Sequence, residues 1–165
     1  MTIAELLLPE FDREMASTRK VLERVPDDRF AWKPHDKSFS MGNLASHIAN
    51  LTSWTVDTMT KTEFDMAGVP PEEMNRAAKN GAELLSWFDA GVAKARAALQ
   101  KPDADYAVPW SLKNGAQVFF TLPRYDCIRG FVLNHVVHHR AQLGVYLRLN
   151  NIAVPGVYGP SADES

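Results

Sequence analysis

The chain has 165 residues, of which 45% are hydrophobic and 23% charged, as in an ordinary soluble globular protein. This length suffices for one domain with a sizeable core and is too short for two, so residues 1–165 are expected to form a single domain. The formal net charge is −2, with acidic and basic residues intermixed. A basic footprint for nucleic acid is therefore absent, and we expect no nucleic-acid partner.

The N-terminus, the hydropathy and the cysteine content indicate where the protein resides. The first residues lack the basic region and the long apolar run of a signal peptide. No apolar stretch approaches the roughly 18 residues of a membrane-spanning helix. Cys127 is the only cysteine, which excludes an intramolecular disulfide and fits a reducing compartment. We therefore predict a soluble, cytoplasmic protein with no membrane association.

Apolar residues recur every three or four positions in four segments, which predicts four long amphipathic helices. The first covers residues 3–25, although Pro9 predicts a break or a late start near its N-terminus. The other three are expected from the N-cap Ser40 to about Lys61, from about Arg76 or Gly81 to Gln100, and from Arg124 to Asn150.

The segments between these helices are predicted to be loops. Residues 62–80 contain several turn formers, and Pro71 could begin a helical turn there. Residues 117–121 are β-prone and could be extended or pack as a loop. Since no convincing set of alternating strands is present, we predict an all-α fold, a four-helix bundle. The long second connection allows a crossover between helices two and three, and the last five residues are expected to be frayed.

The fourth predicted helix carries two histidines on its apolar side. His135 and His139 are four residues apart, so they lie roughly 40° apart around the helix and one turn above each other. A buried imidazole needs partners for both nitrogens, and a metal ion is one such partner. His138 points about 100° away from His139 and is expected at the rim or on the surface.

His47 lies on the apolar stripe of the second predicted helix and offers a third ligand. Three neutral imidazoles projecting into a bundle can hold Zn²⁺ or Ni²⁺ and leave a position for water or substrate. The alternative is that all three are hydrogen-bonded core residues of a metal-free bundle. Gln142, one turn beyond His139, and Asn43, one turn before His47, are candidate partners of the ligand or metal. For Asn43 we favour a capping or surface role.

Two segments resemble motifs of one family. Residues 134–148, with His139-Arg-Ala-Gln142-Leu, resemble the last-helix signature of the DinB/YfiT-like metalloproteins, and residues 40–49 resemble their second-helix motif. The resemblance covers essentially the whole chain. It implies a four-helix bundle with a crossover between helices two and three, often dimeric. It also implies a divalent metal, commonly Zn²⁺ or Ni²⁺, bound by His47, His135 and His139.

The resemblance also implies an activity, because some relatives are S-transferases or isomerases that use bacillithiol, mycothiol or glutathione. We therefore predict a metal-dependent transferase, in which the metal lowers the pKa of a low-molecular-weight thiol that attacks a small electrophilic substrate. The alternatives are a hydrolase with a metal-activated water and a non-enzymatic metal-binding or stress-response protein. No catalytic side chain is assigned. Cys127 is expected to be a packed thiol rather than a nucleophile.

Overall fold

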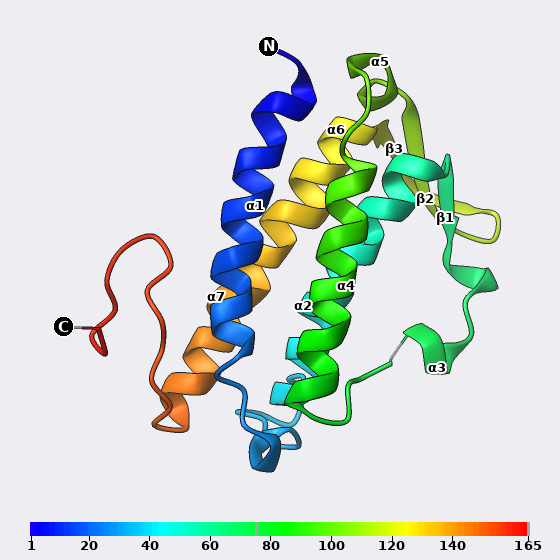
Figure 1. The fold of residues 1–165 in the computed structure, drawn as a ribbon. Coiled ribbons are helices and arrows are strands. Elements are labelled where there is room, and N and C mark those ends of the chain that lie inside the picture. Colours follow the sequence, from blue (N-terminus) through cyan, green and yellow to red (C-terminus); the bar gives the residue numbers. More distant parts are fainter. Residues whose placement is uncertain (75, 165) are drawn as a thin grey trace.

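The computed structural model describes residues 1–74 and 76–164 and is mostly helical. Asn75, in the predicted loop 62–80, and Ser165, the last of the five residues expected to be frayed, lie outside the described residues. Four long helical segments lie side by side (Figure 1). They are α1 (Ile3–Leu22), α2 (Met41–Thr60), α4 (Gly81–Ala98) and a continuous run of α6 (Arg124–Cys127), the π-helical segment η3 (Ile128–Leu133) and α7 (Asn134–Leu149).

The pairing of the strands that follow α2 and α4 shows how these two helices run relative to each other. The strand β1 (Glu63–Asp65) comes directly after α2 and pairs in parallel with β2 (Pro109–Asn114), which follows α4 and the short α5 (Asp103–Tyr106). The C-terminal ends of α2 and α4 therefore lie at the same end of the bundle, and the two helices are parallel (Figure 1). The intervening chain, with η2 (Met66–Gly68) and α3 (Pro71–Met74), makes the predicted crossover.

A small sheet at one end of the bundle departs from the predicted all-α class. Its strand order is β1-β2-β3, and β3 (Gln117–Pro123) is antiparallel to β2. The β-prone run at residues 117–121 forms part of β3. The sequence does not reveal β1 and β2, because β1 has only three residues and the alternation in β2 covers only two apolar positions, Trp110 and Leu112. The prediction of a purely helical bundle is wrong in this respect.

The helix α1 runs without interruption through Pro9, contrary to the break expected there. A capping box fixes its first turn: the Thr2 hydroxyl accepts from the Glu5 N–H (3.2 Å), and the Glu5 carboxylate accepts from the Thr2 N–H (2.7 Å). Proline removes the N–H that would bond to the Glu5 carbonyl, but Glu5 is exposed and water can hydrate that carbonyl.

The core is a continuous cluster of buried apolar side chains between the long helices. Its fully buried members include Phe11, Leu22, Leu44, Ile48, Leu84, Phe88, Ile128 and Leu143.

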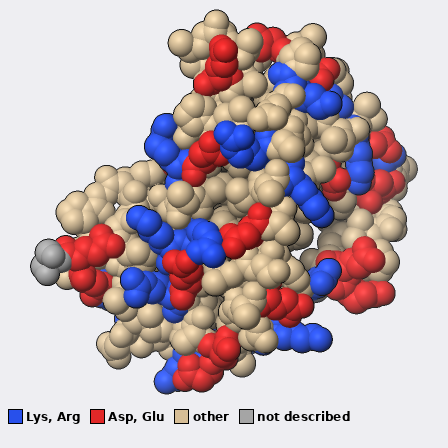
Figure 2. All heavy atoms as spheres, viewed as in Figure 1, with Lys and Arg blue, Asp and Glu red and all other residues tan. Residues whose placement is uncertain are grey.

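The α1–α2 connection contains the short 3-10 helix η1 (Asp27–Arg29). On the face shown in Figure 2, acidic and basic side chains are interspersed. Among the described helices, none has the length and apolar character needed to cross a bilayer.

Candidate metal centre

Three imidazoles meet between α2 and α7. The Nε2 atom of His47 lies 3.4 Å from that of His135, which in turn lies 2.8 Å from that of His139. One nitrogen from each ring lies within 4.8 Å of the other two. Over residues 1–74 and 76–164, this is the only group of three or more His, Cys, Asp or Glu side chains with such spacing. The structure thus brings together the three histidines that the sequence indicates as ligands.

Two oxygen atoms fix the rings of the α7 histidines. The Nδ1 atom of His135 lies 3.3 Å from the Phe131 carbonyl oxygen, and Nδ1 of His139 lies 2.7 Å from Oε1 of Gln142. These oxygens can only accept, so the Nδ1 atoms facing them carry the hydrogens. In neutral rings the Nε2 atoms of His135 and His139 are then unprotonated, and both face His47 and each other.

Unprotonated nitrogens 2.8 Å apart repel each other unless a proton or a cation lies between them. Burial, helped by the nearby His139 and His135, lowers the pKa of His47 to about 4. Burial is also the main cause that lowers the pKa of His135 and of His139, so neutral rings are favoured at neutral pH. A cation between the rings could satisfy all three nitrogens.

The spacing of the nitrogens fits a divalent metal. Two imidazole nitrogens bound to a tetrahedral zinc ion, each at about 2.05 Å, lie about 3.3 Å apart. The Nε2 atoms of His47 and His135 are 3.4 Å apart and those of His135 and His139 are 2.8 Å apart, close to this value, and the three donor atoms all lie within 4.8 Å of one another. The donor set of three imidazoles suits zinc and nickel.

The other residues singled out in the sequence lie at or outside the edge of this centre. Asn43 is exposed, and its backbone N–H donates to the capping Ser40 hydroxyl (3.2 Å), whereas its side chain has no described contact with the triad. His138 is exposed, with its ring 4.9 Å from that of His139. Cys127 is buried, and burial together with Asp126 raises the pKa of its thiol to about 11.

Sequence reasoning missed two contributors to the centre. The acceptor for His135 is a backbone carbonyl in the π-helical segment η3, and π-helical turns are frequent at functional sites. The only signal of irregular geometry there is Gly130, a glycine inside a helical pattern. Phe39, in the loop before α2, places its ring 5.9 Å from that of His47. Its loop position gave no periodicity that could have predicted this.

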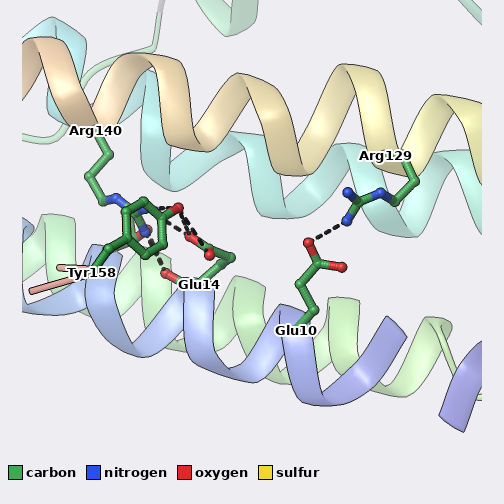
Figure 3. Close-up of polar contacts among 6 residues, drawn as sticks. Glu10, Glu14, Arg129, Arg140 and Tyr158 are labelled. Atoms are coloured by element: carbon green, nitrogen blue, oxygen red, sulfur yellow. Dashed lines mark hydrogen bonds and ion pairs between the residues drawn. The ribbon is translucent and has the colours of Figure 1, made fainter. Parts of the chain in front are cut away.

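Arg140 follows His139 in the sequence but points to the other side of α7, where it clamps this helix to α1 (Figure 3). Its side chain is 3% exposed and forms a 2.8 Å ion pair with Glu14. It also donates to the Glu14 carbonyl (3.1 Å) and to the Tyr158 hydroxyl (2.8 Å). The Tyr158 hydroxyl donates to the Glu14 carboxylate (3.0 Å), which ties the C-terminal segment to the same pair. Glu10 and Arg129 form a second ion pair between the helices.

A crossover bundle with three convergent imidazoles defines a class of helical proteins able to hold a divalent metal between two helices. The profile of the DinB superfamily matches residues 10–143, and the chain belongs to this superfamily. A search of curated proteins gave no significant match.

Two solved structures share the fold. One is a DinB-like protein from Bacillus cereus ATCC 10987, with a TM-score of 0.70 and 22% identity, covering 95% of this chain and 98% of its own. The other is a DinB-like protein, YjoA, from Bacillus subtilis, with a TM-score of 0.69 and 14% identity, covering 97% of this chain and 98% of its own. At these identities the likeness establishes the fold alone.

The buried ion pair between Arg140 and Glu14 predicts a large loss of stability for Arg140→Met. The substitution leaves the Glu14 carboxylate, 13% exposed, without its cation, and we expect the free energy of unfolding to fall by about 3–5 kcal/mol in urea titrations. Arg96→Met is the matched control, because it removes the exposed Arg96–Asp12 pair and should cost less than about 1 kcal/mol. Equal losses of unfolding free energy in the two variants would contradict a special role for the Arg140–Glu14 pair.

The hydrogen bond to His139 predicts a role for Gln142 in metal affinity. Gln142→Leu removes the acceptor at Nδ1, so we expect the affinity for Zn²⁺ to fall roughly 10- to 100-fold in competition with a chromophoric chelator. Gln100→Leu, at an exposed position just after α4, is the control and should bind Zn²⁺ like the unmodified protein. An unchanged affinity in Gln142→Leu would show that this contact does not support the centre.

Proposed function

We propose that this chain binds one divalent metal ion, zinc or nickel, through His47, His135 and His139, and acts as a metal-dependent transferase. It would use a low-molecular-weight thiol on a small electrophilic substrate. The observation that carries this proposal is the convergence of three Nε2 atoms without a fourth protein ligand in the described part of the chain. Closed structural zinc sites have four protein ligands, whereas three leave a position for an exchangeable group.

The residues of the site each have a distinct task in this proposal. His47 reaches the centre from α2, and the pair on α7 completes it, so the centre joins two helices. The Phe131 carbonyl and Gln142 hold the two α7 rings in one tautomer and one orientation. Burial keeps the rings neutral, which is the form that binds metal.

The chemistry requires a thiol from a second molecule. A bound divalent ion lowers the pKa of a coordinated thiol and so favours the nucleophilic thiolate. Cys127 is the only cysteine in the chain, and its buried thiol, with a pKa of about 11, stays protonated at neutral pH. A thiol of this chain therefore does not serve as the nucleophile, which supports a low-molecular-weight thiol.

Metal content tests the proposal. We expect protein purified without an affinity tag to hold about one zinc or nickel ion per chain, and His139→Ala to hold almost none. His138→Ala is the matched control, because His138 is the adjacent, exposed histidine outside the cluster, and its metal content should not change. Elemental analysis of the three proteins, before and after incubation with Zn²⁺ or Ni²⁺, gives the result.

The possible outcomes separate the functions that use this site. Absence of metal from the unmodified protein, even after incubation, would make the histidines core residues of a metal-free bundle. Metal-dependent consumption of a thiol with an electrophile would support the transferase. Metal-dependent hydrolysis without a thiol would indicate a hydrolase, and metal binding without turnover in either screen would indicate a non-enzymatic metal-binding protein.

A further inference from the structure

Aromatic rings flank the three histidines on two sides. The Phe39 ring lies 5.9 Å from the His47 ring. The Trp54 indole lies 6.0 Å from the His47 ring and 5.5 Å from the His135 ring, meeting both edge to face. The surroundings of the centre are therefore apolar on the side of the α1–α2 loop and along α2.

Phe39 is held at its backbone while its ring stays accessible. The Tyr146 hydroxyl on α7 donates to the Phe39 carbonyl (3.3 Å), and the Tyr146 ring meets Trp32 edge to face at 5.5 Å. These contacts attach the loop to α7. The Phe39 side chain nevertheless remains 51% exposed, so the protein itself does not bury this ring beside the histidines.

Apolar surface continues along the helix that carries His135 and His139. Phe131, four residues before His135, is 37% exposed and stacks on Phe120 of β3, with their ring centroids 4.3 Å apart. The carbonyl of the same Phe131 accepts from His135, so the stacked pair and the metal centre share one residue. The apolar area thus extends from the histidines toward the small sheet.

In the described part of the chain, the three imidazoles make no hydrogen bond or ring contact with a charged side chain. Among the described residues, the partners of the three imidazoles in hydrogen bonds and ring contacts are other histidines, Phe39, Trp54, the Phe131 carbonyl and Gln142. An aromatic group on a bound ligand would gain edge-to-face or stacked contacts with these rings.

We propose that the exchangeable position beside the three histidines selects a thiol with an aromatic or other apolar group next to its sulfur, and that Phe39 and Trp54 are the residues that select it. This inference rests on the proposed function, because the thiol takes the position left open by the three ligands. Small thiols that carry no such group gain no contact with these rings and are expected to bind more weakly.

The test compares two thiols of matched chain length on the cobalt-loaded protein. Cobalt(II) replaces zinc as a visible probe, and the sulfur-to-cobalt charge-transfer absorption reports thiol binding without any turnover. We expect 2-phenylethanethiol to bind at least about tenfold more tightly than 2-mercaptoethanol, since the phenyl ring gains aromatic contacts and the hydroxyl group gains none.

Variants then assign the preference to particular rings. Phe39→Ala should weaken 2-phenylethanethiol binding about three- to tenfold and leave 2-mercaptoethanol binding unchanged, with Trp54→Ala acting in the same direction. Phe119→Ala, which removes an exposed ring of β3 outside the contacts of the histidines, is the matched control and should change neither affinity.

The failure of this inference is distinguishable from the failure of the proposed function. If cobalt does not bind, the metal centre itself is refuted. If cobalt binds but the two thiols bind equally, 2-mercaptoethanol binds more tightly, or neither thiol binds, the selection by aromatic rings is refuted and the metal centre stands. A preference for 2-phenylethanethiol that Phe39→Ala and Trp54→Ala leave unchanged would also refute the role of these two rings.

Discussion

The candidate metal centre depends on the tautomers of His135 and His139. The Phe131 carbonyl and the Gln142 amide oxygen require the Nδ1 atoms of His135 and His139 to be protonated, which leaves the lone pairs of their Nε2 atoms aimed at one point. His47 adds a third nitrogen from another helix. Such an arrangement is unfavourable without a cation, because neutral acceptors then face each other in a partly buried place. The polar geometry thereby favours metal binding over a satisfied apolar core.

The bundle around the centre supports this geometry from both sides. On the far side of α7, Arg140 pairs with Glu14 and fixes the helix to α1 (Figure 3). On the far side of α2, Gly91 allows α4 to approach closely, since a Cβ atom at this position would clash with the Thr52 hydroxyl. Both helices that carry ligands are therefore packed against a further helix. We infer that packed helices position the three histidines. Of the residues around them, Phe39 comes from a loop.

Much of this architecture follows from local sequence rules. The apolar periodicity locates the long helices, and Ser40 begins α2 as predicted by capping. The break predicted at Pro9 does not occur, because the capping box at Thr2 and Glu5 already stabilises the first turn. The sheet escapes prediction because β1 is three residues long and depends on pairing with β2, more than 40 residues away. The two alternating apolar residues of β2 are too few to predict this long-range pairing from a local pattern.

The candidate site also has features that the local sequence predicts and features that depend on tertiary packing. The spacing of His135 and His139 places them on one face of a helix, which local geometry alone can establish. The approach of His47 depends on how α2 and α7 pack, so its role came from the apolar stripe and the family resemblance together. The Phe131 carbonyl could not be predicted, because any residue supplies a backbone acceptor. Phe39 could not be placed either, since loop conformation carries no helical repeat.

The most direct test is a crystal structure of the zinc-loaded protein with anomalous diffraction data collected at the zinc edge. The structure predicts one anomalous peak about 2.0–2.1 Å from the Nε2 atoms of His47, His135 and His139, with a non-protein ligand in the remaining position. A peak bonded to the Nδ1 atoms, a fourth protein ligand that closes the site, or no peak between these rings would contradict it.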